Sequence, residues 1–130
     1  MSLSDPIADL LTRIRNATRA KHRYVDTRYT KFLWNLIKVL QSKGFVNEIL
    51  VDEDKKKMRV FLRYADGRES VIEQLTRISS PGRRRYIGYR DVPRINGGMG
   101  LVVLSTPEGI VDGEQAREKK VGGELLCSVQ

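Results

Sequence analysis

This 130-residue sequence has few of the residues that build disulfides, metal sites or catalytic centres. It holds one cysteine and one histidine, which excludes an internal disulfide and disfavours a zinc site. Its longest apolar runs, such as residues 101–104, fall far short of the roughly 20 residues that a membrane-spanning helix needs. Ser4 and Asp5 place an acid where a secretory signal peptide would be basic. We therefore expect an intracellular protein of a reducing compartment, outside any membrane.

What the sequence has in excess is positive charge. Lysine and arginine together number 24 against 16 acids, which gives a formal net charge of +8. The excess is local: residues 83–94 carry five arginines and one acid, whereas residues 106–130 carry three bases and five acids. Such a charge favours a polyanionic partner, either a nucleic acid or an anionic membrane surface. The absence of long apolar runs makes the membrane the weaker of the two.

The first half of the chain is expected to form two helices and a small sheet. Asp5 and Pro6 suit the start of a helix whose apolar stripe runs from Ile7 to Ala17, and Thr30 caps a second helix that ends at Gly44. Strand-forming segments follow the β pattern at 25–29, 45–51, 58–65 and, after a tight turn at Asp66-Gly67, at 68–78. The prediction is an αβαββ(β) lobe with two helices on an antiparallel sheet.

A cluster of chain-breaking residues at 79–82, Ser-Ser-Pro-Gly, predicts a linker between a first lobe at 1–78 and a second at 83–130. In the second lobe, Asp112 and Gln115 form a capping box for a short helix that runs through Lys120. A wholly apolar strand at 101–104 and a short strand at Ile110-Val111 precede this helix, and a last strand at 124–129 follows Gly122-Gly123. The predicted fold class is α+β with two small lobes, the second mostly β with one short helix.

The apolar strand at 101–104 leads into a tight turn, residues 105–109, that begins with Ser105 and Thr106. Hydroxyl groups beside exposed amides suit contact with phosphates, sugars and base edges, because each hydroxyl both donates and accepts. An ordinary hairpin turn is the alternative, and turn chemistry alone favours it. Tyrosines interleave with arginines at 83–90, a pattern that permits stacking on bases but also fits a strand edge covered by tyrosines.

Two other charged segments keep alternative interpretations. Arg13, Arg15 and Asn16 fall largely off the apolar stripe of the first helix, so they either contact phosphates or form a solvated helix end. The run at 52–57, three acids followed by three lysines, predicts a solvated hairpin. Its consecutive carboxylates, without glycine or spaced ligands, do not match a calcium loop. We expect no metal site.

A nucleotide-binding enzyme is the alternative from another class, and the glycines Gly98 and Gly100 are its best motif. The third glycine of the fingerprint would be Val103, and an apolar strand follows where a phosphate-binding helix is required. A Ser105 nucleophile would need a base, and His22 has no evident orienting partner. We therefore predict no enzyme activity and no cofactor.

Four blocks of sequence are more specific than any single motif. They are Asp5–Ala17, Ser105-Thr106-x-x-Gly109, Glu114–Glu118 and Val121–Cys127. In this order, over nearly the whole chain, they resemble bacterial small-subunit ribosomal protein eight, a family of rRNA-binding proteins. The resemblance implies a two-lobe α+β protein of the cytoplasmic ribosome that binds an internal helix of the central domain of small-subunit rRNA and supports its folding. It also implies neighbouring ribosomal proteins as partners and, in some species, binding to the protein's own messenger RNA.

The resemblance further implies which residues contact RNA. The main loop and its supports are Ser105, Thr106, Pro107, Gly109, Tyr86, Gly122, Gly123 and Glu124. The N-terminal lobe is expected to give further contacts to the RNA backbone, from Arg13, Arg15, Asn16 and Lys31. Independently of the resemblance, the arginine-rich segment after the linker adds Arg84 and Arg85 as candidate RNA contacts. The chain departs from the family pattern at Pro107, Asp112-Gly113, Lys120 and Gln130, where the family commonly has a small hydroxyl at the first position, a glycine at Lys120 and an aromatic end.

Overall fold

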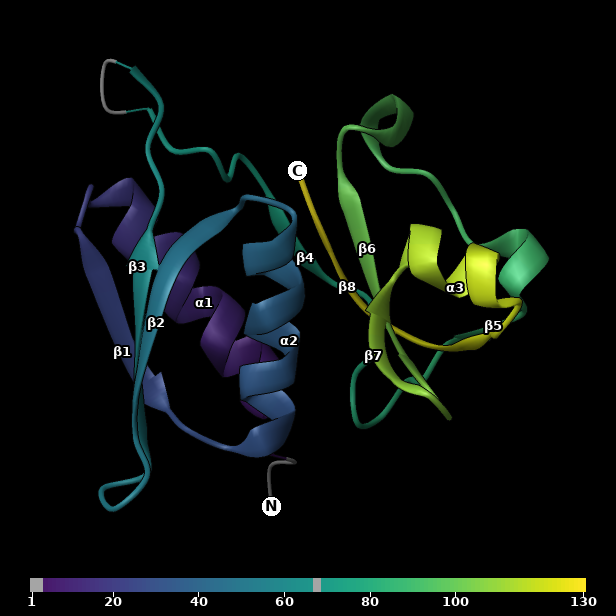
Figure 1. The fold of residues 1–130 in the computed structure, drawn as a ribbon, viewed down its shortest axis with the longest axis horizontal. Coiled ribbons are helices and arrows are strands. Elements are labelled where there is room, and N and C mark those ends of the chain that lie inside the picture. Colours follow the sequence, from purple (N-terminus) through teal and green to yellow (C-terminus); the bar gives the residue numbers. More distant parts are fainter. Residues whose placement is uncertain (1–3, 67–68) are drawn as a thin grey trace.

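The N-terminal lobe packs two helices against one face of a three-stranded sheet (Figure 1). A computed structural model describes residues 4–66 and 69–130. The elements of this lobe are α1 (Pro6–Arg19), β1 (Tyr24–Arg28), α2 (Lys31–Ser42), β2 (Val46–Asp52) and β3 (Lys57–Leu62). The sheet is antiparallel with the order β1-β3-β2, so β2 and β1 are its two edges.

Local sequence signals set the ends of these helices. The Asp5 carboxylate accepts a hydrogen bond from the amide of Ala8 at 3.1 Å, and the Thr30 hydroxyl accepts one from the amide of Leu33 at 3.1 Å. Each bond satisfies an amide that has no partner inside the helix. After α2, Gly44 adopts a φ of +82°, the left-handed conformation that stops a helix. Both predicted helices are thus confirmed.

The C-terminal lobe is a five-stranded antiparallel sheet with one short helix. Its strands are β4 (Leu75–Arg77), β5 (Tyr86–Ile87), β6 (Leu101–Thr106), β7 (Gly109–Asp112) and β8 (Gly123–Val129), and its helix is α3 (Gly113–Lys119). The order is β4-β8-β6-β7, and β5 also pairs with β8. The Asp112–Gln115 capping box is present in both directions, with bonds of 3.0 and 3.3 Å. The α+β class is therefore confirmed.

The strand predicted at 68–78 forms only at its end, as β4 at Leu75–Arg77, and it joins the other sheet, where it pairs with β8. Among residues 69–74, Ser70 forms an isolated bridge with Tyr64. Val71 and Ile72 are adjacent, so they do not follow the alternation that a strand on a core requires. The amides after them donate instead to the carbonyl of Gln130, at 2.6 and 2.8 Å. Gly67, in the predicted turn, lies outside the described residues.

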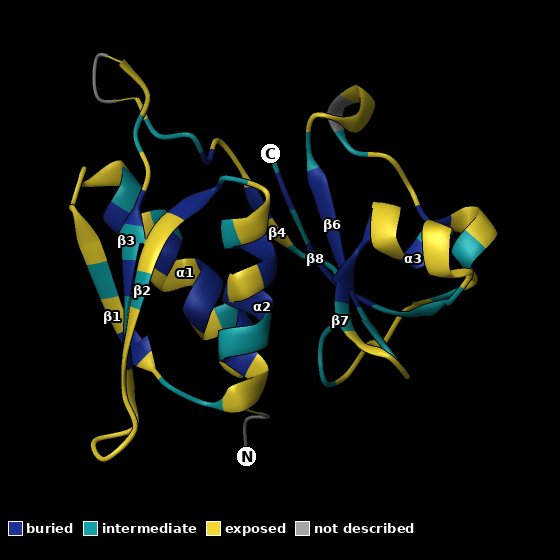
Figure 2. Ribbon diagram, in the orientation of Figure 1, coloured by how far each residue is buried: buried dark blue, intermediate teal, exposed yellow. Residues whose placement is uncertain are grey.

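The two lobes share a core. Buried residues of α1 and α2 belong to the same hydrophobic cluster as Leu101, Val103, Cys127 and Val129 of β6 and β8. Figure 2 shows this buried material running from the helices across to β6 and β8. A second, smaller cluster lies between α3 and the other face of the C-terminal sheet. The division at residues 79–82 stays a prediction, because nothing in the structure tests it directly.

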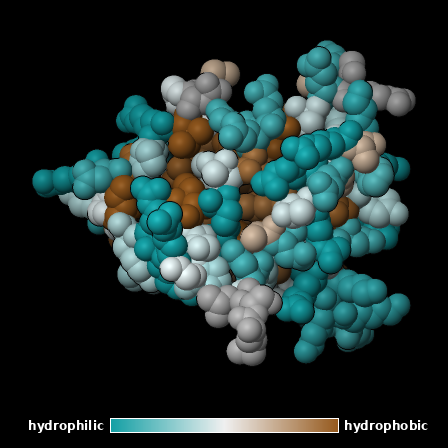
Figure 3. Space-filling view, turned by 180° about the vertical axis from the view of Figure 1, so that it is seen from behind, coloured by the Kyte–Doolittle hydropathy of each residue, from teal (hydrophilic) through white to brown (hydrophobic). Residues whose placement is uncertain are grey.

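Polar contacts also cross between the lobes. The Arg15 guanidinium donates to the carbonyl of Leu75 at 2.6 Å, and Arg77 lies 3.2 Å from the carboxylate of Asp5. Seen from behind, hydrophobic residues gather over the middle of the molecule and hydrophilic ones cover its ends (Figure 3). On this face, the hydrophilic side chains lie mainly toward the two ends.

Candidate nucleic-acid interface

The turn that carries the two hydroxyls is a hairpin between β6 and β7. Thr106 pairs with Gly109 across it, and Gly109 has a φ of +109°. The Thr106 hydroxyl donates to the carbonyl of Gly109 at 2.8 Å and accepts from the amide of Glu108 at 3.1 Å. The single donor of this hydroxyl and one of its two acceptor lone pairs are therefore used within the turn. Among the described residues, none forms a side-chain hydrogen bond with Ser105, whose hydroxyl remains available to a ligand.

Two glycines, Gly123 at the start of β8 and Gly122 just before it, bring three backbones together beside this turn. A Cβ atom added at Gly123 would lie 2.1 Å from the carbonyl oxygen of Ser105, and one added at Gly122 would lie 2.4 Å from that of Ile87. Real Cβ contacts do not reach such distances, so only glycine fits at either position. The sequence feature Gly-Gly therefore reflects close backbone packing.

These contacts form a shallow groove on the C-terminal lobe. It is lined by Tyr86, Ile87, Gly88, Ser105, Thr106, Pro107, Gly122, Gly123 and Glu124. Seven of these were predicted as RNA contacts, and the structure brings all seven together. The Tyr86 side chain is 71% exposed. Such a large aromatic side chain usually buries much of its surface, and Tyr86 does not do so in the free protein. Its ring is thus open for stacking.

An ion pair lies at the edge of the groove. The Arg84 guanidinium contacts both oxygens of the Glu124 carboxylate, at 3.2 and 3.1 Å. The Glu124 side chain is only 12% exposed, whereas that of Arg84 is 53% exposed. The largely buried Glu124 carboxylate therefore holds the more exposed Arg84 guanidinium beside the groove. Arg85 is exposed, and its backbone bonds to Ser79 and Leu125 fix the path of this segment.

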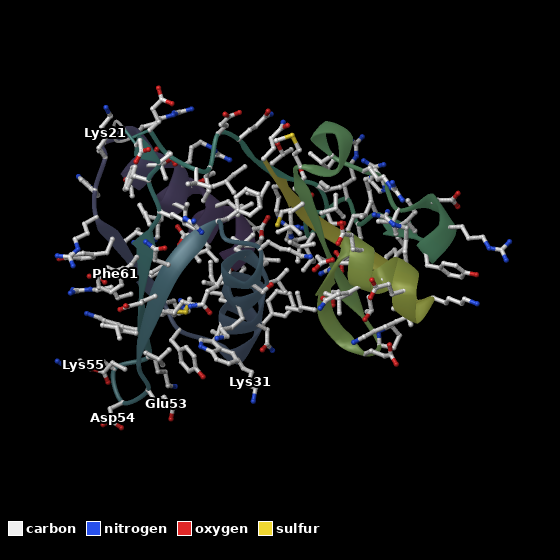
Figure 4. All side chains as sticks on the ribbon, turned by 45° about the horizontal axis from the view of Figure 1, so that its top comes forward. Lys21, Lys31, Glu53, Asp54, Lys55 and Phe61 are labelled. Atoms are coloured by element: carbon white, nitrogen blue, oxygen red, sulfur yellow. The ribbon has the colours of Figure 1, made fainter. Side chains whose placement is uncertain are left out.

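The predicted residues of the N-terminal lobe lie outside this groove. Arg13 is paired with Asp9 at 2.9 Å, and Arg15 is directed to the carbonyl of Leu75 between the lobes. Asn16 and Lys31 are exposed, and Lys31 projects from the start of α2 (Figure 4). Whether these four contact RNA stays a prediction, and for Arg15 the structure assigns a contact between the lobes.

Sequence reasoning did not include Ile87 and Gly88 in the site. Both line the groove because β5 pairs with β8, which places Ile87 opposite Gly123. A two-residue strand gives no periodicity from which this pairing could be read. The only sequence signal is that Ile87 and Gly88 lie directly beside Tyr86, which was predicted.

Other chemistry is limited in the described part of the chain. Residues 4–66 and 69–130 contain no group of three histidine, cysteine or acidic residues placed to hold a metal ion. Burial raises the pKa of the Cys127 thiol to about 12, so the thiolate form is scarce at neutral pH. No described helix is both long and apolar enough to cross a membrane.

Comparison with known proteins bears on the whole chain. The sequence model of the family described as Ribosomal protein S8 matches residues 5–130. The chain belongs to this family. A small ribosomal subunit protein uS8 of Protochlamydia amoebophila is 47% identical over 132 residues, which cover 99% of each chain. Proteins of the same name from Chlamydia pneumoniae and Chlamydia felis are 52% and 51% identical over 128 residues, 97% of this chain and 96% of theirs.

The match confirms the resemblance that the four sequence blocks indicated. It spans the groove and both sheets, so every residue that lines the groove belongs to the part of the chain shared with the S8 family. The S8 relatives named above are small ribosomal subunit proteins, a class of structural constituents.

Proposed function

We propose that this chain is a structural constituent of the small subunit of the cytoplasmic ribosome and binds an internal helix of the central domain of small-subunit rRNA through the groove on its C-terminal lobe. The observation that carries the proposal is the convergence of the Ser105 hydroxyl, the exposed Tyr86 ring and the Gly122-Gly123 backbone in that groove. Family membership supports the same assignment. Binding there supports folding of the rRNA domain during assembly.

The chemistry of the groove fits an RNA helix. The free Ser105 hydroxyl can donate to or accept from a base edge or a ribose 2′-hydroxyl, which distinguishes RNA from DNA. The Tyr86 ring offers a face for an unpaired base. Thr106 contributes differently, because its hydroxyl stiffens the turn through Glu108 and Gly109 and so holds Ser105 in place.

Arginines beside the groove supply affinity without sequence preference. Arg84, held by Glu124, can turn to a phosphate, and Arg85 is exposed next to it. Because neutralised phosphates release counterions, binding by a chain of net charge +8 is expected to weaken as salt rises. The N-terminal residues Arg13, Asn16 and Lys31 would add phosphate contacts of the same kind.

The test is a titration of Ser105→Ala against the rRNA helix and against a plain RNA duplex of equal length. Loss of a hydroxyl that contacts RNA should cost about 1 to 2 kcal/mol on the rRNA helix and little on the duplex. Thr76→Ala, which removes an exposed hydroxyl on β4 outside the groove, is the matched control. Circular dichroism shows whether the fold is kept. Unchanged affinity of Ser105→Ala for the rRNA helix would refute the assignment of the groove.

The same groove is also proposed to bind a second RNA, the protein's own messenger. A messenger RNA helix of the same shape would compete with rRNA, which would let the protein regulate its own synthesis. Competition between the rRNA helix and the leader of its own messenger, measured with the wild type and Ser105→Ala, tests this. Equal competition by an unrelated messenger of the same length would rule it out.

A further inference from the structure

A loop interrupts the edge of the C-terminal sheet beside the groove. β4 continues along β8 as far as Ser79, whose amide donates to the carbonyl of Leu125 at 3.1 Å. The chain then leaves the sheet at residues 80–84 and returns to the same edge, where the amide of Leu125 donates to the carbonyl of Arg85 at 2.9 Å. Figure 1 shows this loop between β4 and β5. Ser79 and Arg85, at the two ends of the loop, therefore meet side by side at one residue of β8.

The Ser79 side chain joins these two ends. Ser79 is 0% exposed, and its hydroxyl accepts a hydrogen bond from the amide of Arg85 at 2.9 Å and donates one to the carbonyl of Arg85 at 3.3 Å. A hydroxyl makes both bonds at once because it has one donor and two acceptor lone pairs. Among the described residues, the Arg85 amide has no other hydrogen-bond partner. The loop neck, as we call this contact between Ser79 and Arg85, therefore depends on one buried hydroxyl.

The loop beyond the neck is tight. Ser80 and Arg83 exchange two backbone hydrogen bonds, each 3.0 Å long, around a turn at Pro81-Gly82. The ring of Pro81 fixes its own φ, which limits the turn further. Because the loop has little freedom of its own, its position relative to β8 is set at the neck.

Exposed arginines occupy the segment that the neck positions. Residues 83–85 are all arginine, and all three are exposed. Arg84 contacts Glu124 at the edge of the groove, and Tyr86, which lines the groove, follows the arginines directly. Ser79 itself does not line the groove and has no exposed surface, so it cannot contact RNA. Any effect of Ser79 on RNA binding must therefore act through its neighbours.

We propose that Ser79 is a positioning residue for RNA binding, whose buried hydroxyl holds Arg84 and Arg85 beside the groove in the free protein. This rests on the proposed function, because the position of the arginines matters only if the groove binds RNA. A loop that is already ordered loses less conformational entropy on binding than a mobile one. Without the hydroxyl, the Arg85 amide loses its partner and the neck opens to water. The arginines then have to be ordered when RNA binds, which weakens binding.

A purely structural role of Ser79 is the alternative. In that role Ser79 would affect binding through the stability of the C-terminal lobe, whether or not the arginines are present. A positioning residue acts through the arginines, so its effect disappears when they are removed. The two roles therefore predict different results in a double-mutant cycle, which measures how far the effects of two changes depend on each other.

The experiment measures the affinity of the full chain for the rRNA helix, with and without the arginines. We expect Ser79→Ala to weaken binding at least fivefold in the wild-type chain and at most twofold in a chain that carries Arg84→Ala with Arg85→Ala. Ser70→Ala is the matched control, because the Ser70 hydroxyl also accepts a hydrogen bond from a loop amide, that of Ile72 at 3.1 Å, but lies away from the groove. It should change the affinity by less than twofold. Circular dichroism shows whether each variant keeps the fold.

Hydrogen exchange of the free protein, followed by NMR, is the second readout. In Ser79→Ala the Arg85 amide should exchange at least tenfold faster, whereas the amides of β6 should keep their wild-type rates. Ser79→Cys keeps nearly the same side-chain volume but forms weaker hydrogen bonds, so its affinity should lie between those of the wild type and Ser79→Ala. The cysteine variant takes the place of Ser79→Ala in the cycle if the alanine variant does not fold.

Four results would each overturn the role of Ser79. They are an equal loss of affinity with and without the arginines, an unchanged affinity of a folded Ser79→Ala chain, an unchanged exchange rate of the Arg85 amide, and unfolding of both Ser79 variants. Failure of the wild-type chain itself to bind the rRNA helix would instead refute the proposed function, and the role of Ser79 with it.

Discussion

The two lobes are held in shape by different kinds of contact. The N-terminal lobe relies on large side chains: Leu10, Ile14, Leu36 and Ile37 are fully buried between the helices and the sheet. The C-terminal lobe also has apolar strands, but its groove is set by backbones in direct contact at Gly122 and Gly123. Among the described residues of the N-terminal lobe, the one glycine, Gly44, would meet only the flexible end of an arginine. Side-chain packing can adjust to small changes, whereas backbone contacts cannot.

The difference matters for function. A groove shaped by backbone keeps its form without depending on flexible side chains, which suits recognition of a fixed RNA shape. The N-terminal lobe instead presents the charged hairpin at 52–57 and the sheet edge formed by β2 at its surface. The two lobes still share one core, so a change in one is expected to reach the other.

The largest expected effect tests that shared core. Leu36→Ala empties a fully buried position of α2 and should lower the free energy of unfolding by about 2 to 5 kcal/mol. Because the core is continuous, urea unfolding followed by Trp34 fluorescence and hydrogen exchange of β6 should shift together. Leu50→Ala, at an exposed position, is the control and should cost under ~0.5 kcal/mol. A shift of the Trp34 signal alone would mean that the lobes unfold separately.

The next effect tests backbone packing in the groove. Gly123→Ala forces a Cβ against the carbonyl oxygen of Ser105. We expect the free energy of unfolding to fall by about 1 to 3 kcal/mol, and the free energy of selective binding to the rRNA helix to fall by more than that. Gly82→Ala, where nothing lies within 4 Å of the added atom, should leave both measurements unchanged. Wild-type binding by Gly123→Ala would show that the groove is less rigid than its contacts indicate.

A smaller effect is expected between the lobes. Lys43 lies 3.6 Å from the buried Asp112 carboxylate and 3.4 Å from that of Glu114. Lys43→Met would leave Asp112 without its cation, at a cost of about 1 kcal/mol because Lys43 itself is partly exposed. Lys119→Met, on the exposed side of α3, should cost less. Equal losses in chemical denaturation would mean that the pair contributes nothing specific.

The same pair predicts a pH dependence. Burial lowers the pKa of Lys43, but the Asp112 and Glu114 carboxylates outweigh it, so the pKa is raised in the folded protein. A raised pKa means that the stabilisation is complete below the ordinary lysine pKa of about 10.4 and is lost as the pH rises through the folded-state value. The stability difference between wild type and Lys43→Met should therefore shrink in alkaline solution. A difference that stays constant there would contradict this assignment.

The smallest effect is a gain. Lys120 ends α3 in the left-handed conformation, with a φ of +56°, which suits glycine better. Lys120→Gly relieves this strain, but it also raises the conformational entropy of the unfolded chain, which opposes the gain. The net result should be a rise of about 0.5 kcal/mol in the free energy of unfolding. Lys119→Gly, at the last residue of α3, should instead lower the free energy of unfolding, by less than the roughly 1 kcal/mol of a helix interior. Destabilisation by both changes would show that Lys120 makes contacts that outweigh its strain.

Local features were predicted well because their causes are local. The caps at Asp5 and Thr30, the stop at Gly44 and the capping box at Asp112 depend on residues within a few positions of one another. The apolar stripes of α1 and α2 follow from helical spacing. The residue blocks that identified the family likewise needed no structure.

What the tertiary structure alone decided is which distant segments meet. The sequence by itself determined the helix caps, the apolar stripes of the helices, the net charge and the family. Each of these depends on residue types and on their spacing along the chain. The sequence did not determine that β4 joins the C-terminal sheet, that Arg15 is directed to Leu75, or that Ile87 and Gly88 complete the groove. Strand pairing between segments some 35 to 55 residues apart depends on which edges remain open after the core has packed, and that competition leaves no local pattern.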